Sequence, residues 1–172
     1  AFLRRFLPNH TWLHNRYVNG KEVDEYAFQL QDTVNNGVLA HESFHVLGAP
    51  DLYRYVNTTI TPIGSWDLMA WNTNPPQHMS CFMKWKYGTW ISSIPEITTS
   101  NTYTLQPATS STGNCYKIDS PNSATEYFIV EYRREASSIF EAPIPGTGML
   151  VYRINSAATG NSQGPPDEIY VY

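Results

Sequence analysis

Residues 41–53 read His41-Glu42-Ser43-Phe44-His45-Val46-Leu47-Gly48-Ala49-Pro50-Asp51-Leu52-Tyr53, and this stretch decides the fold of the first half of the chain. Ala40, Phe44 and Leu47 lie at positions i, i+4 and i+7, which is the spacing of one helical face. The sequence therefore predicts a helix over Asp32–Leu47 with these three side chains toward the core.

The end of this helix is better defined than its beginning. Gly48 can adopt the left-handed conformation that ends a helix, and Pro50 prevents its continuation. At the other end, Asp32 and Asn36 are both suitable N-caps, and Gly37 weakens the first turn. Two starting points for the helix therefore stay open.

The segment before the helix has the pattern of a strand. Over Glu25–Leu30, apolar and polar residues alternate, so Tyr26, Phe28 and Leu30 share one face. We expect neighbouring strands to cover this face.

His41, Glu42 and His45 form the pattern H-E-x-x-H on the predicted helix. Residues four apart on a helix lie about 5–6 Å apart between Cβ atoms, so both imidazoles can reach one ion. Zn²⁺ accepts imidazole nitrogen, and a catalytic zinc site uses three protein ligands. After Gly48 turns the chain, Asp51 follows three residues later, at the spacing of the long zincin motif, where His is commoner. The pattern predicts His41, His45 and Asp51 as ligands and Glu42 as general base.

An alternative interpretation without a metal is that the two histidines are hydrogen-bonded helix residues and that Glu42 is an exposed carboxylate. The combination of residue types at these spacings favours the metal site.

Met69 lies in a predicted turn over Gly64–Ala70. A methionine there can place its thioether beneath the imidazoles as an apolar floor, although Met69 taken alone would most often be a core residue. We expect Asp67 to hydrogen-bond within this turn and not to bind the metal.

From residue 92 onward the sequence changes to short apolar runs separated by Pro, Gly, Ser and Asn. This change predicts two parts, residues 1–91 and 92–172, the second being a small sheet or sandwich that continues beyond the chain end. The strands predicted there are Thr102–Gln106, Cys115–Ile118, Thr125–Tyr132, Thr147–Ile154 and Glu168–Tyr172.

Composition excludes some classes of function. The net charge is −4 and the basic residues are scattered, which disfavours nucleic-acid binding. No apolar run approaches the roughly 20 residues that a transmembrane helix needs. Asn, Thr and Ser supply 43 of 172 residues, which favours a turn-rich, extracytoplasmic β protein. Cys81 and Cys115 can form one disulfide, but two buried thiols are the simpler interpretation.

Several stretches together resemble one family. They are the run from His41 to Tyr53, Ser65-Trp66-Asp67-Leu68-Met69-Ala70, and Trp85-Lys86-Tyr87-Gly88-Thr89-Trp90, with weaker likeness at Leu7–His10 and Gly146–Asn155. These residues are similar to the immune inhibitor A family of secreted bacterial metallopeptidases.

The resemblance implies an α+β fold: a metzincin-like catalytic portion with an active-site helix and a Met-turn, followed by a β-rich, sandwich-like subdomain. It implies a zinc endopeptidase of extracellular proteins, within a longer secreted or cell-surface bacterial precursor. Because only 40 residues precede His41, we expect the upper part of the catalytic portion to be incomplete. Neither a calcium site nor the oligomeric state follows from the sequence.

Other residues have two possible roles. Tyr53 and Tyr55 can contact an oxyanion or substrate, although packing is the commoner use of tyrosine. We expect His10, His14 and His78 at the surface or in a substrate cleft.

The whole chain also has alternative functions. It can be a non-catalytic zinc-containing binding or structural module of a secreted surface protein, or a zinc hydrolase acting on non-peptide amides. A structural zinc site would need a fourth ligand.

Overall fold

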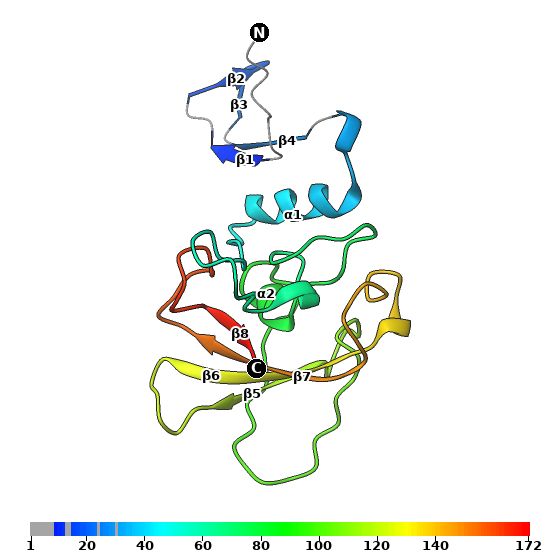
Figure 1. Ribbon diagram of the computed structural model, residues 1–172, viewed down its shortest axis with the longest axis vertical. Coiled ribbons are helices and arrows are strands. Elements are labelled where there is room, and N and C mark those ends of the chain that lie inside the picture. The colour runs from blue at the N-terminus through cyan, green and yellow to red at the C-terminus, as the bar shows by residue number, and fades with distance from the viewer. Residues whose placement is uncertain (1–8, 13–14, 24, 30) are drawn as a thin grey trace.

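The computed structural model describes residues 9–12, 15–23, 25–29 and 31–172, and these form a small mixed α/β structure (Figure 1). The described part contains two α-helices and three antiparallel sheets. The helices are α1 (Asn36–Val46) and α2 (Cys81–Lys86). The strands are β1 (Asn9–Trp12), β2 (Tyr17–Val18), β3 (Lys21–Glu22), β4 (Glu25–Phe28), β5 (Cys115–Asp119), β6 (Glu126–Arg133), β7 (Gly148–Asn155) and β8 (Ile169–Val171).

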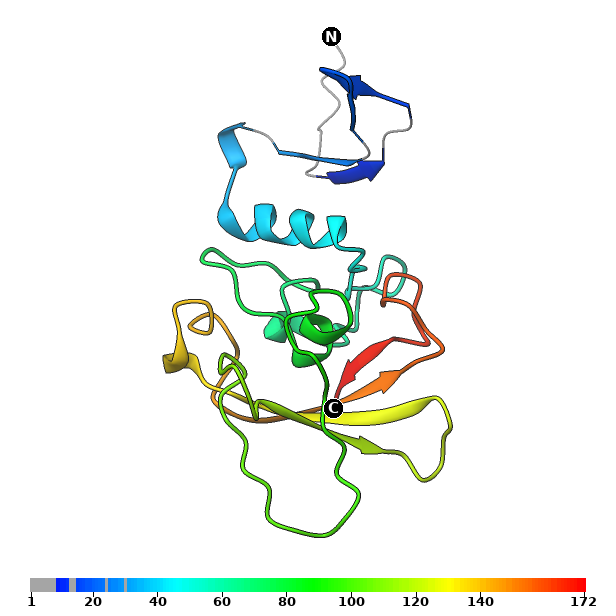
Figure 2. The same ribbon diagram turned by 180° about the vertical axis from the view of Figure 1, so that it is seen from behind.

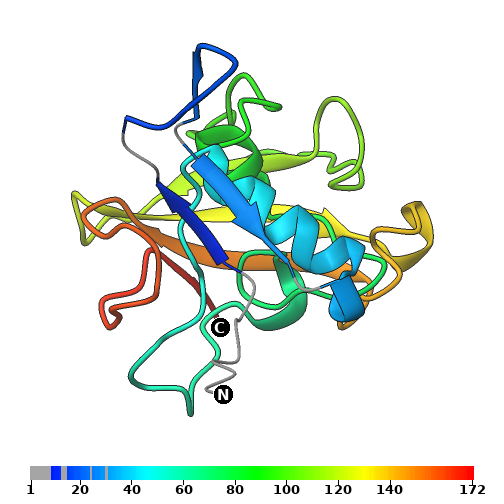
Figure 3. The same ribbon diagram turned by 90° about the horizontal axis from the view of Figure 1, so that it is seen from above.

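Two small hairpin-like pairs precede α1. β1 pairs with β4, and β2 pairs with β3. The β1–β4 pair lies against α1, as the view from above shows (Figure 3). β4 confirms the strand expected before the helix, but the side chains of Tyr26, Phe28 and Leu30, and of His10 and His14, lie outside the described residues.

α1 confirms the predicted helix but begins later than Asp32. Neither Asp32 nor Asn36 is the N-cap; Asn35 has an extended backbone and its side-chain oxygen accepts a hydrogen bond from Val38 N at 2.9 Å. Asp32 belongs to a separate 3₁₀ turn over Gln31–Thr33. The side-chain cap at Asn35 therefore sets the start of the helix.

The buried face of α1 differs from the prediction in one residue. Phe44 is buried and Ala40 packs against the core, but Leu47 is 49% exposed. α1 ends at Val46, so Leu47 is its C-cap and no longer continues the helical stripe. The face toward the interior instead includes the polar residues His41 and Glu42.

The second half forms one four-stranded antiparallel sheet in the order β5-β6-β7-β8. These strands confirm four of the five predictions, but Thr102–Gln106 is not a strand in the described structure. Pro107 offers no N–H, and Gln106 N donates to Gly113 O within a local loop, so this segment makes only an isolated bridge at Pro107.

The covering of this sheet also differs from a sandwich. In the described residues no second sheet faces it; α2 and the coil segments after α1 lie between the sheet and α1 (Figures 1 and 2). Helix α2 was not predicted from the sequence. Its N-cap is Ser80, whose hydroxyl accepts from Met83 N, and Phe82 and Met83 are buried.

One hydrophobic cluster joins the two halves of the chain. It contains Phe44, Leu52 and Met69 from the first half together with Ile129 and Tyr152 from the sheet. Residues on both sides of position 91 therefore share a core.

Cys81 and Cys115 are both buried and both free. The disulfide is therefore not formed, and the interpretation as two buried thiols is confirmed. Within the described residues, no helix has the length and apolarity to cross a membrane.

We expect Gly37→Ala to destabilise the protein, although alanine is the better helix former. A Cβ at this position would lie 1.9 Å from Thr73 O, so helix and loop would have to separate. Overpacking of this kind costs about 1–3 kcal/mol of unfolding free energy, measurable by urea denaturation. Gly146→Ala, where a Cβ meets nothing within 4 Å, is the control. Equal stability of the two variants would contradict the prediction.

Candidate metal centre

His41 and His45 lie one turn apart on α1, and each donates from Nδ1 to a backbone carbonyl. The Nδ1–O distances are 3.1 Å from His41 to Leu68 O and 2.7 Å from His45 to Ala49 O. Because a carbonyl oxygen only accepts, each Nδ1 carries the hydrogen. In the neutral rings, Nε2 therefore has the lone pair that a metal requires.

Asp51 comes back toward these rings because the chain reverses after α1. Gly48 has φ +88°, and Leu47, Gly48 and Ala49 donate their N–H groups to carbonyls of the last helical turn. Asp51 Oδ1 lies 3.1 Å from His41 Nε2 and 3.5 Å from His45 Nε2. The three residues predicted as ligands are thus brought together.

The two separations that involve Asp51 Oδ1 fit a tetrahedral metal ion. Ligand atoms that each lie 2.0–2.1 Å from a tetrahedral zinc are about 3.3 Å apart, and the two measured distances bracket that value. His41, His45 and Asp51 are also the group that offers ligand atoms within 4.8 Å of one another in the described part of the chain.

The second observation in favour of a cation concerns Asp51 Oδ1. This buried oxygen has no hydrogen-bond partner among the described residues. The nitrogens that face it carry lone pairs when the rings are neutral, so three electron-rich atoms converge. A proton or a metal ion must lie among them to offset the repulsion.

The protonation states of the three side chains also indicate that a positive charge lies among them. Burial opposes ionisation of Asp51, but the contacts with His41, His45 and Tyr55 outweigh it and lower the pKa of Asp51 well below its ordinary value of 3.8. Burial also opposes protonation of His45, yet Asp51 and the Ala49 carbonyl raise its pKa above 6.5. Without a metal, the centre therefore favours a proton on the imidazole beside an ionised carboxylate.

Tyr55 contacts the other oxygen of the same carboxylate. Its hydroxyl donates to Asp51 Oδ2, so it fixes the rotation of the side chain. The Tyr53 ring lies 6.4 Å from the His41 ring, and burial together with the charge of Asp51 raises the pKa of Tyr53 to about 12. The expected contacts of both tyrosines with an oxyanion or substrate stay predictions.

The turn that contains Met69 contacts both His41 on α1 and the segment that carries Asp51. Leu68 O accepts from His41, and Met69 O accepts from Leu52 N at 2.9 Å, one residue after Asp51. Asp67 Oδ1 accepts from Met69 N at 2.8 Å, which confirms its predicted role within the turn. Met69 is buried in the core, and the placement of its sulfur beneath the imidazoles stays a prediction.

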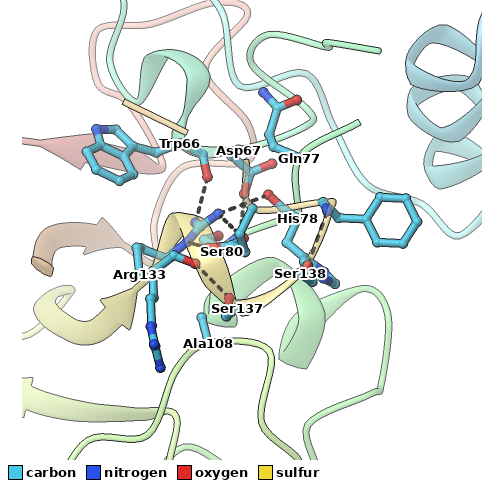
Figure 4. A network of polar contacts seen from close by, with 12 residues as sticks. Trp66, Asp67, Gln77, His78, Ser80, Ala108, Arg133, Ser137 and Ser138 are labelled. Atoms are coloured by element: carbon cyan, nitrogen blue, oxygen red, sulfur yellow. Dashed lines mark hydrogen bonds and ion pairs between the residues drawn. The ribbon is translucent and has the colours of Figure 1, made fainter. Parts of the chain in front are cut away.

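Arg133 anchors this turn from the sheet, a role not predicted from the sequence (Figure 4). Its guanidinium is fully buried and donates to Trp66 O at 2.7 Å, to both Glu141 oxygens and to Glu131. Asp67 Oδ2 accepts from Ser80 N at 2.7 Å. In the sequence, Arg133 is one of two adjacent arginines, and no local pattern marks its role.

Glu42 lies beside the centre, at an open cleft. It is only 7% exposed, and together with His41 it lines a cleft of about 510 Å³. The apolar residues along this cleft include Val38, Leu52, Tyr53, Ile60, Pro62 and Trp71. A substrate in the cleft would reach the carboxylate and the first imidazole together.

His78 lies elsewhere. It lines a separate hollow of about 170 Å³ with Lys84, and burial, followed by the charges of Lys84 and Arg133, lowers its pKa to about 4. His78 therefore does not join the group formed by His41, His45 and Asp51.

Comparisons with protein-family models, with curated proteins and with solved structures gave no match.

Asp51→Ala should weaken zinc binding by more than the 10–100-fold typical of losing a group that only orients a ligand. The reason is that Oδ1 faces the Nε2 atoms of both imidazoles, at 3.1 Å from His41 and 3.5 Å from His45. Competition with a chelator of known affinity measures the effect. Asp67→Ala is the matched control: it removes the acceptor for Met69 N and Ser80 N and should chiefly lower the melting temperature. Unchanged zinc affinity in Asp51→Ala would overturn the assignment.

Proposed function

We propose that this chain carries the catalytic portion of a zinc-dependent endopeptidase that hydrolyses extracellular proteins. The observation that supports it best is the convergence of Asp51 Oδ1 with His41 and His45 Nε2, beside Glu42 in an open cleft. The resemblance to the immune inhibitor A family, described above, favours a secreted or surface-associated bacterial protein with a metzincin-like catalytic portion.

The residues that would hold zinc are His41, His45 and Asp51. Two imidazoles and a carboxylate favour Zn²⁺ over Ca²⁺ and Mg²⁺, which prefer oxygen ligands. A bound zinc ion supplies a Lewis acid that activates water and polarises a carbonyl group. The carbonyls of Leu68 and Ala49 hold the rings in the required tautomer.

Glu42 is the group available for proton transfer. Its carboxylate accepts the proton of the attacking water and then donates it to the departing amine. It follows His41 directly on α1, so the helix fixes its place beside the ligands. Glu42 is itself buried, which limits the access of solvent to its carboxylate although the cleft is open.

The cleft itself favours a polypeptide substrate. It is open to solvent, and its apolar residues offer contacts for side chains of an extended chain. A closed structural zinc site uses four protein ligands. The group in the described residues offers three protein ligands. In a structural site, Glu42 beside this group would have no chemical role. These features favour the enzyme over the non-catalytic module.

Glu42→Gln should retain zinc and lose peptidase activity by at least about 10²-fold, since an amide cannot accept the proton. Digestion of a broad protein substrate by the zinc-loaded protein, with metal content measured in parallel, checks this. Glu135→Gln, a change on the exposed 3₁₀ turn Glu135–Ser137, is the control. Near-parental turnover in Glu42→Gln would show that another base operates, and loss of zinc would show that Glu42 is a ligand.

The stabilisation by zinc should grow as pH rises from 5.5 to 7.5. In the metal-free protein the pKa of His45 is raised, so its contribution to stability is full below pH 6.5 and is lost as pH rises through its folded pKa. The pKa of Asp51 is lowered, so its contribution is present above pH 3.8 and is lost only in strong acid. The proton on the imidazole competes with the metal in the lower part of this range.

Melting temperatures with zinc and with a chelator, at both pH values, measure this increment. An equal increment at pH 5.5 and 7.5 would show that histidine protonation does not compete with binding.

A further inference from the structure

The residue that carries the proposed third ligand lies in a segment without regular secondary structure. Residues 47–55 follow α1 as coil, yet Asp51 must be held to within a few tenths of an ångström to bind a metal. On one side, Leu52 N donates to Met69 O. On the other side lies the loop between β7 and β8, residues 156–168, beside this segment in both Figure 1 and Figure 2.

Asn161 is the main contact from that loop. It is completely buried. Its backbone N donates to Asp51 O at 2.9 Å, and its side-chain Nδ2 donates to Leu52 O at 3.0 Å and to Ile169 O at 2.9 Å. Its Oδ1 accepts from Ile169 N at 3.2 Å. The carboxamide of Asn161 therefore links the segment that carries Asp51 to Ile169, the first residue of β8.

Gly160 lets the loop approach closely enough to make these bonds. It has φ +66°, and a Cβ there would lie 2.7 Å from Pro50 Cβ and 2.9 Å from Asp51 O. Its N–H donates to the buried carboxylate of Glu168. The backbone of the loop thus packs directly on the residue before Asp51 and on Asp51 itself.

A second anchor lies three residues beyond Asp51. Arg54 and Asp167 form a buried two-bond ion pair, and Tyr55 N donates to Ser162 O at 3.0 Å. The segment is thus held on both sides of Leu52. Every one of these partners is about 110 residues away in the sequence.

We propose that Asn161 is a positioning residue of the metal centre, which fixes the backbone of residues 51–52 so that Asp51 Oδ1 lies between the two imidazoles. This inference rests on the proposed zinc site. Asn161 touches neither metal nor substrate; it acts through Asp51. Its loss allows the carboxylate to move while leaving both histidines in place on α1.

The test uses the full chain and compares Asn161→Ala, Asn161→Ser and Asn114→Ala. Asn114 is the matched control because it is also buried and its Nδ2 also donates to a loop carbonyl, that of Ser110. Zinc affinity is measured by chelator competition at a temperature where each metal-free variant is folded, as circular dichroism verifies. Thermal melting of the metal-free variants records the purely structural cost.

We expect Asn161→Ala to weaken zinc binding by about 10–100-fold, the range for losing a group that orients a ligand. Asn161→Ser, which keeps one donor, should fall between Asn161→Ala and the parent, and provides the measurement if the alanine variant does not fold. Asn114→Ala should melt earlier but bind zinc like the parent. The absorption spectrum of the Co²⁺-loaded protein should change in the Asn161 variants and not in Asn114→Ala, since it reports the geometry of the ligands.

Two outcomes would overturn the inference. If the Asn161 variants bind zinc as tightly as the parent and keep its Co²⁺ spectrum, Asn161 has only a structural role and the zinc site itself stands. If the parent chain binds no zinc, the proposed metal centre fails and the positioning role fails with it.

Discussion

The contact of one carboxylate oxygen with two imidazole nitrogens is the constraint on which the organisation of this protein depends. Asp51 Oδ1 lies within 3.5 Å of His41 and His45 Nε2, while both Nδ1 hydrogens are already donated to carbonyls. Such an arrangement of lone pairs is unfavourable unless a cation or a proton offsets it. The surrounding structure must therefore hold together three groups whose lone pairs repel one another unless a cation or a proton lies among them.

Separate parts of the fold hold the three groups. α1 fixes the two histidines at one-turn spacing, and the turn before Met69 accepts from His41. The loop between β7 and β8 and the turn at Met69 hold the Asp51 segment from opposite sides. Arg133 of β6 supports that turn through Trp66. The sheet thus contributes to a centre whose three proposed ligands all lie in the first half of the chain.

The sequence predicted what short-range spacing controls. The helix, its end at Gly48, the cluster of His41, His45 and Asp51, and four of the five strands follow from residues within a few positions of one another. It did not predict α2, the exposure of Leu47 or the roles of Arg133 and Asn161, and it left open whether the second half forms one sheet or a sandwich. The contacts of Arg133 with Trp66 and of Asn161 with Leu52 join residues 67 and 109 positions apart, and no local pattern of apolar residues or spacing records such pairings.

The polar face of α1 also bears on stability. A helix of this length gains most of its stability from packing an apolar face, yet the buried residues of α1 include His41 and Glu42 beside Phe44 and Gly37. Burying these groups opposes folding, whereas a ligand that binds only the folded state stabilises it in proportion to the logarithm of its concentration over its Kd. If zinc is that ligand, then His41, whose burial weakens the metal-free helix, is also a residue through which the metal strengthens the fold. Catalytic chemistry and metal-dependent stability then share one set of atoms, and the β7–β8 loop, by placing Asp51, contributes to both.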